Sequence, residues 1–158
     1  MKQRTNFFRK NPAVTQLLFN LSGYLSKSKV EQSLLQLVNF RVSQINGCAF
    51  CLNADTAMLR ANGETEQRLY VLNAWREAPF YTERERAALA WAEAVTNVRD
   101  GHVPDEVYEA ATKHFSEEEL IDLTLTITTT NTYNRFNISF RTPADVPKPW
   151  EKAVEAVK

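Results

Sequence analysis

The stretch that decides the fold runs from residue 29 to residue 63 and reads KVEQSLLQLVNFRVSQINGCAFCLNADTAMLRANG. In its first half, apolar side chains recur at steps of three and four residues, the period of one face of an α-helix. These side chains are Val30, Leu34, Leu37, Val38, Val42 and Ile45. The pattern predicts a helix over residues 29–45 that buries one face.

Two Asn-Gly pairs divide this stretch. The pair at 46–47 ends the first helix, because glycine tolerates the left-handed conformation found after a helix C-terminus. A second helix then runs from Cys48 to residue 61, and the pair at 62–63 stops it. Cys48 and Cys51 are therefore predicted at the N-terminus of this second helix.

Further helices are predicted toward the C-terminus. Residues 65–77 form one or two short helices. Thr82 with Glu85 makes a capping box, which opens an alanine-rich helix over 82–98. A turn then leads to a helix over 104–114.

The segment from Ser116 to Arg141 has two interpretations. Apolar residues alternate with threonine over 123–128, which is typical of a strand. However, no turn signal interrupts the segment, and a single strand of that length would be anomalous. We predict a buried helix that opens at a capping box of Ser116 with Glu119 and whose threonines bond back to the preceding turn.

The chain as a whole is predicted to be one all-α domain over residues 1–158. Only four glycines and six prolines punctuate it, and no repeat or linker divides it. A C-terminal tail covers 142–158, with an extended stretch at 143–149 and a short helix at 150–158.

Composition limits the partners and the compartment. Nineteen basic residues balance nineteen acidic ones, so neither nucleic acid nor an anionic membrane surface is an expected partner. No apolar run approaches the ~20 residues of a membrane-spanning helix, and no signal peptide is recognised. We therefore expect a cytoplasmic protein. In that compartment a close cysteine pair indicates catalysis, redox sensing or a metal, because structural disulfides are rare there.

The spacing of Cys48 and Cys51 suits a redox-active dithiol. Two intervening residues let the sulfurs meet across one helical turn. In the chain-entropy model, a loop this small stabilises a fold by only about 2 kcal/mol. The unpaired N–H groups and the dipole at the helix N-terminus also favour a thiolate. A disulfide between these cysteines would stabilise the fold only weakly, and the pair can cycle between the dithiol and the disulfide.

The same spacing identifies two polar neighbours. Asp55 lies four residues after Cys51, and so on the same helix face. Gln36 lies twelve residues before Cys48, on the preceding helix.

Two other roles are open to Cys48 and Cys51. The cysteines can be ordinary core residues, although this spacing after Asn-Gly argues against coincidence. A zinc site needs more ligands, and the only histidines, His102 and His114, lie far away in no zinc-finger spacing. We therefore predict no metal and no cofactor.

With these motifs in view, the chain resembles the AhpD-like alkylhydroperoxidase group of the carboxymuconolactone decarboxylase family. The resemblance covers about residues 30–141. It is carried by RVSQINGCAFCL at 41–52, AWRE at 74–77, TERERAALAWAE at 82–93, HFSEEEL at 114–120 and NTYNR at 131–135.

The resemblance implies an all-helical AhpD-like domain that forms homo-oligomers, commonly trimers or hexamers. It also implies that Cys51 attacks a peroxide and becomes a sulfenic acid. Cys48 then resolves this acid as a disulfide, which an external thiol reduces.

The sequence departs from the family at two positions. Asp55 stands where the family has a histidine, and Gln36 stands where it commonly has a glutamate. In the family these groups pass the proton that activates the cysteine. Gln36 cannot titrate, and an ionised Asp55 repels a neighbouring thiolate. We expect both residues to orient a water or the substrate, with turnover reduced on the 10²–10⁴-fold scale of general acid–base catalysis.

These observations favour a thiol-dependent peroxidase, or a disulfide oxidoreductase, that uses Cys51 and Cys48. The two departures leave open a non-catalytic binding or scaffold protein of the same fold that has lost the proton relay. The family's lactone decarboxylase chemistry is a further alternative, but it does not need the cysteine pair.

Overall fold

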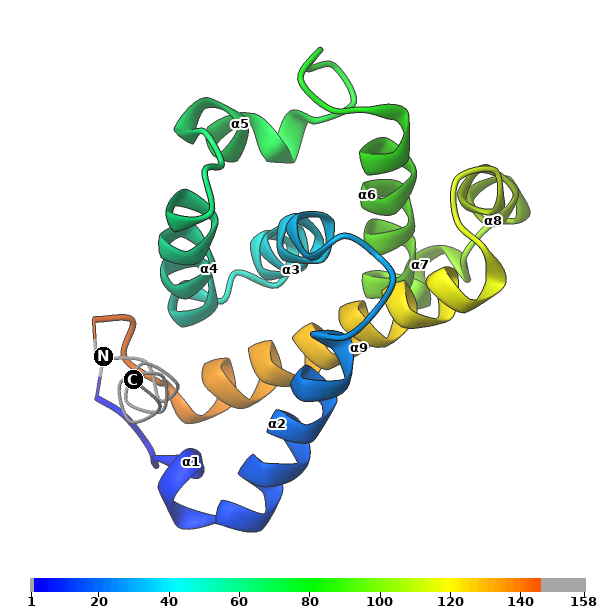
Figure 1. The fold of residues 1–158 in the computed structure, drawn as a ribbon. Coiled ribbons are helices and arrows are strands. Elements are labelled where there is room, and N and C mark those ends of the chain that lie inside the picture. The colour runs from blue at the N-terminus through cyan, green and yellow to red at the C-terminus, as the bar shows by residue number, and fades with distance from the viewer. Residues whose placement is uncertain (1, 146–158) are drawn as a thin grey trace.

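Helix α3 (Gln32–Asn46) lies at the centre of the molecule and packs against α4 (Ala49–Ala61), α6 (Glu83–Thr96) and α9 (Glu117–Phe140) (Figure 1). Five of the six apolar residues of the predicted stripe are buried: Leu34, Leu37, Val38 and Val42 on α3, and Val30, which precedes the helix because α3 begins at Gln32 and not at residue 29. The sixth, Ile45, is half-buried. The predicted stripe on α3 thus forms the middle of the core.

The computed structural model describes residues 2–145, and in this range it contains helices and no strand. The predicted all-α fold is confirmed. The helix expected at 150–158 lies outside the described residues, as does most of the stretch at 143–149. None of the helices within residues 2–145 has the length and apolar character needed to cross a membrane.

Two apolar clusters meet on α3. One joins α3 to α6, α8 (Asp105–Thr112) and α9. The other joins α3 to α4, α6, α5 (Glu66–Val71) and the short 3₁₀ helix η1 (Leu72–Ala74). Helix α3 therefore contributes to both clusters, through residues that extend as far as Val42, before the cysteine pair.

The predicted helix starts agree with the structure. Reciprocal capping boxes form between Thr82 and Glu85 at the start of α6, and between Ser116 and Glu119 at the start of α9. Helix α6 ends at Thr96, two residues before the predicted end. A separate helical turn, α7 (Val98–Gly101), occupies the position where a plain turn was expected.

Helix α9 settles the ambiguous segment. The residues that alternate with threonine are helical throughout. The predicted back-bonding occurs, because hydroxyls donate to carbonyls one turn earlier at Thr124, Thr126, Thr128, Thr130 and Thr132. These bonds give the threonine hydroxyls hydrogen-bond partners within the helix itself.

Two N-terminal helices, α1 (Phe7–Lys10) and α2 (Pro12–Leu25), were not predicted. The side chain of Asn11 accepts the Val14 backbone N–H, and Pro12 occupies the first turn of α2, so the start signal was present. Apolar residues of α2 lie outside its contact with α9 as well, since Leu17 is 64% exposed and Tyr24 is 57% exposed.

Candidate redox site

The cysteine pair lies where α3 ends and α4 begins. Gly47 closes α3 with a φ of 66°, a left-handed conformation that glycine adopts without strain. Cys48 is the N-cap of α4, and its Sγ accepts the Cys51 backbone N–H at 3.3 Å. The two cysteines form a disulfide with their Cα atoms 5.3 Å apart. The predicted place of the pair, at a helix N-terminus, is confirmed.

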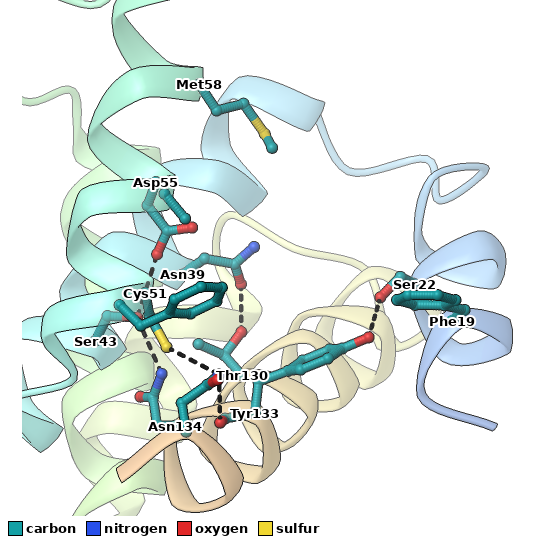
Figure 2. A pocket seen from close by; sticks show the side chains of 13 residues that line it. Phe19, Ser22, Asn39, Ser43, Cys51, Asp55, Met58, Thr130, Tyr133 and Asn134 are labelled. Carbon is teal, nitrogen blue, oxygen red and sulfur yellow. Dashed lines mark hydrogen bonds between the residues drawn. The ribbon is translucent and has the colours of Figure 1, made fainter. Parts of the chain in front are cut away.

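A cavity of about 320 Å³ adjoins one of the two cysteines. Among the described residues its lining includes Cys51 and Asp55, whereas Cys48 is not part of it. Phe19, Phe50 and Met58 supply apolar walls. Figure 2 shows the Cys51 sulfur directed toward α9. A small molecule in this cavity would therefore meet Cys51 and not Cys48.

A side-chain amide contacts the sulfur of Cys51. Asn137 Nδ2 lies 3.6 Å from Cys51 Sγ and 2.9 Å from the Tyr133 carbonyl oxygen, one turn earlier on α9. Asn137 is buried and lines the same cavity. The amide can donate to both acceptors at once, because it carries two hydrogens.

Asp55 accepts the last hydrogen bond of a chain that runs through buried polar side chains of α3 and α9. The Ser43 hydroxyl donates to Asp55 Oδ2 at 3.2 Å, and Asn134 Nδ2 donates to Ser43 Oγ at 3.2 Å (Figure 2). Asn46 Nδ2 donates in turn to Asn134 Oδ1 at 2.8 Å. Ser43 and Asn134 are fully buried. Each group in this chain donates toward Asp55, so the chain favours a carboxylate oxygen as its final acceptor.

The far end of the chain is anchored on Asn131. Its Oδ1 accepts from Asn46 Nδ2 at 2.9 Å and from Arg135 Nη1 at 2.7 Å. Its Nδ2 donates to Thr96 on α6. The hydrogen-bonded chain from Asp55 to Thr96 therefore connects α3, α4, α6 and α9 next to the cysteine pair.

Gln36 is placed apart from the other predicted site residues. It lines an adjoining cavity of about 190 Å³, and its Oε1 accepts from Asn62 Nδ2 at 2.9 Å. Asn39 and Thr130, joined by a 2.6 Å hydrogen bond, line both cavities. The structure thus brings Cys48, Cys51 and Asp55 together and puts Gln36 in the neighbouring space. The role of Gln36 stays a prediction.

Tyr133 lies on the far wall of the Cys51 cavity, where its hydroxyl is 3.3 Å from Ser22 Oγ (Figure 2). Burial raises the pKa of Tyr133, so its phenol stays neutral at pH 7. Arg41 lies elsewhere, in an ion pair with Glu93 at 2.7 Å. Within residues 2–145, no three His, Cys, Asp or Glu side chains are grouped to hold a metal ion.

Ser43, Asn134 and Asn137 were missed by sequence reasoning. A signal existed on α9, because the asparagines at 131, 134 and 137 recur every three residues and so share a helix face. What this face contacts depends on how α9 crosses α3 and α4, which the spacing alone does not specify.

Comparisons with known proteins agree on one family. The model of the carboxymuconolactone decarboxylase family matches residues 12–94. The uncharacterised protein YdfG of Bacillus subtilis is 39% identical over 139 residues, which is 88% of this chain and 95% of YdfG.

Two solved structures share the fold. One is a protein of unknown function from Agrobacterium tumefaciens, for which a role as the antioxidant defence protein AhpD has been suggested. It is 37% identical, with a TM-score of 0.89 over 92% of this chain and 100% of its own. The other is a debrominase in complex with 2,3,4-tribromopyrrole. It is 20% identical, with a TM-score of 0.76 over 94% of this chain and 79% of its own. At that identity, the second likeness extends to the fold alone.

Proposed function

The chain belongs to the carboxymuconolactone decarboxylase family and has an AhpD-like fold, and on that premise we propose that it reduces peroxides with Cys51 and Cys48. The substrates are organic hydroperoxides and hydrogen peroxide, and the electrons come from an external dithiol. The antioxidant role suggested for the Agrobacterium protein supports this proposal.

One observation carries the proposal: of the two cysteines, Cys51 lines the cavity and Cys48 does not. Cys48 is also only 1% exposed, and its sulfur caps α4. A peroxide in the cavity can therefore reach Cys51 first. Cys48 is one helical turn away, within bonding distance of an oxidised Cys51.

The reaction balances with these two thiols. The Cys51 thiolate attacks one peroxide oxygen, the O–O bond breaks, and the alcohol leaves with a proton, which gives a Cys51 sulfenic acid. The Cys48 thiol then attacks the sulfenic sulfur, and the disulfide forms with release of water. A dithiol donates two electrons and two protons to restore both thiols, and is itself oxidised to a disulfide.

Asp55 is the group proposed to carry the proton. It lines the same cavity, one turn after Cys51 on α4. As a carboxylate it can take the proton of the Cys51 thiol and return it to the departing alkoxide. The hydrogen bond from Ser43 holds the carboxyl group in place for both steps.

Stoichiometric peroxide consumption by the reduced protein tests the proposal. The parent protein should consume one equivalent of cumene hydroperoxide per chain and lose both thiols. Cys48→Ser should consume one equivalent and stop at the sulfenic acid. Cys51→Ser should consume no more than the variant with both cysteines replaced by serine.

Peroxide consumption by Cys51→Ser at the parent rate would refute the assignment of roles. If the parent consumes no peroxide but its disulfide is reduced by a dithiol, the pair is a disulfide oxidoreductase instead. If it does neither, the fold serves a non-catalytic function.

A further inference from the structure

The side-chain amide of Asn137 contacts the sulfur of Cys51. Its Nδ2 lies 3.6 Å from Cys51 Sγ, within hydrogen-bond range of a sulfur acceptor. The side chain is 3% exposed and lines the Cys51 cavity. A donor in this position is shielded from water, where its effect on a charged acceptor is largest.

The orientation of the Asn137 amide is set by the backbone. The nitrogen and oxygen of an asparagine amide can be exchanged without changing the shape of the side chain. Here one of these atoms lies 2.9 Å from the Tyr133 carbonyl oxygen, which only accepts hydrogen bonds. That atom must be the nitrogen. Because the same nitrogen faces Cys51 Sγ, its second hydrogen is available to the sulfur. Asn137 Oδ1 has no partner within residues 2–145, so nothing there favours the exchanged orientation.

The two sulfurs have different donors. Cys48 Sγ accepts the backbone N–H of Cys51 at the helix N-terminus, the usual device for stabilising a thiolate. The helix N-terminus therefore stabilises a thiolate on Cys48, which does not line the cavity. Without a donor of its own, Cys51 would be the less acidic thiol of the pair.

The titratable groups around Cys51 would not stabilise its thiolate, so the hydrogen bond from Asn137 matters more. On α4 they are Asp55 and Cys48, and on α9 the neutral phenol of Tyr133. From α2 and α3, the lining residues are uncharged. Among the described residues that line the cavity, Asp55 is the one with an acidic side chain, and a carboxylate there disfavours a second negative charge on the sulfur.

We propose that Asn137 is a catalytic residue whose amide donates a hydrogen bond to the thiolate form of reduced Cys51 and so stabilises that form. The inference rests on the proposed function in taking Cys51 as the nucleophile. When the disulfide is reduced, the bond to the Tyr133 carbonyl still anchors the amide, so the donor stays in place for the thiolate. Hydrogen bonding to the charged form of an acid lowers its pKa, and this sets the fraction of Cys51 able to attack a peroxide at pH 7.

The pH profile of Cys51 alkylation by iodoacetamide tests this inference. It is measured in the Cys48→Ser background, where Cys51 is the one thiol present. Asn137→Ala should raise the midpoint of the profile by about one pH unit, which is about a tenfold smaller acid dissociation constant for the Cys51 thiol. Asn137→Asp should raise it further, because it replaces the donor by a second carboxylate. The matched control is Asn53→Ala, which removes an exposed amide from α4 that bonds to the Ala144 carbonyl.

A second readout uses both cysteines and the equilibrium with glutathione. A stabilised thiolate favours the reduced form, so Asn137→Ala should favour the disulfide by about tenfold, or about 30 mV in reduction potential. A residue that only fills space would shift neither the equilibrium nor the alkylation midpoint.

If Asn137→Ala does not fold, NMR of the native reduced protein replaces it. The side-chain amide signals of Asn137 should move with pH at the same midpoint as Cys51 alkylation. Equal midpoints in Asn137→Ala and Asn53→Ala, or amide signals that ignore the titration, would overturn the inference.

The alkylation assay contains no peroxide, so the two proposals fail separately. A midpoint that depends on Asn137 in a protein that does not react with peroxides supports this inference and contradicts the proposed function. Peroxide reduction with an unchanged midpoint overturns the inference alone.

Discussion

Replacement of Glu93 by glutamine tests how α6 is held against α3. The Glu93 carboxylate accepts from Trp75 Nε1 at 2.8 Å and pairs with Arg41 at 2.7 Å and Arg76 at 2.5 Å. The Glu93 and Arg41 side chains are only 15% and 14% exposed, whereas that of Arg76 is 61% exposed. The pair with Arg41 therefore dominates the energetics.

The expected loss follows from this geometry. Breaking a buried ion pair by removing one partner costs about 3–5 kcal/mol. A glutamine oxygen still accepts one hydrogen bond, and the exposed pair with Arg76 contributes little. We therefore expect Glu93→Gln to lower the free energy of unfolding at pH 7 by about 2 kcal/mol.

The same substitution has a predicted pH dependence. Burial would by itself raise the pKa of Glu93, but hydrogen bonds from Trp75, Arg76 and Arg41 outweigh it, and the pKa lies below its ordinary value. A glutamate in the unfolded chain titrates near pH ~4.3. The folded state therefore binds this proton less readily, and the stability from Glu93 is present above about pH 5 and lost as the pH falls through the folded pKa. The gap between parent and variant should shrink toward pH ~3.5.

Urea unfolding followed by circular dichroism, at one protein concentration and in steps from pH ~7 to ~3.5, measures this gap. The control is Glu83→Gln on the same helix, because the Glu83 side chain is 81% exposed. A gap that stays constant with pH, or a Glu83→Gln variant as destabilised as Glu93→Gln, would refute the reasoning.

Urea unfolding also tests three other features. Gly47→Ala puts a side chain at a φ of 66° and should cost about 1 kcal/mol, whereas Gly23→Ala inside α2 should stabilise by about 0.5–1 kcal/mol. Equal effects would contradict the left-handed cap. Thr129 Oγ1 is buried without a partner within residues 2–145, so Thr129→Val should be neutral or stabilising, while Thr126→Val, which loses a 2.9 Å bond, should cost about 1 kcal/mol. The reverse order would show that the Thr129 hydroxyl is bonded. Asn134→Ala removes the hydrogen bonds to the buried Ser43 hydroxyl and to the half-buried Asn46 amide and should cost about 2 kcal/mol. A loss below about 0.5 kcal/mol would contradict a continuous polar chain.

Local signals in the sequence were sufficient for most of the fold. Apolar period, capping boxes and the Asn-Gly pair locate α3, α6 and α9 and place Cys48 at the start of α4, because each depends on residues within one or two turns. Helix α2 was not predicted, although Asn11 and Pro12 mark its start, because apolar residues such as Leu17 also lie on its exposed side.

The site could be predicted only in part. Cys48, Cys51 and Asp55 lie within two turns of one helix, so spacing alone brings them together. Gln36 lies ten residues before the end of α3, about 15 Å of helix rise, and α4 returns alongside it so that Asn62 becomes its partner. Asn134 and Asn137 reach the site from α9, 91 residues after Ser43 and 86 residues after Cys51, through a helix crossing that no local pattern encodes.

Trapping of the oxidised sulfur tests the central claim, that Cys51 is the peroxide-reacting thiol, most directly. Reduced protein is mixed with one equivalent of cumene hydroperoxide in the presence of dimedone, which labels sulfenic acids, and its peptides are sequenced by mass spectrometry. The label should appear on Cys51, and it should increase in Cys48→Ser, where no resolving thiol competes. Labelling of Cys48 in the parent, or an unlabelled Cys51 in Cys48→Ser after the peroxide is added, would contradict the account.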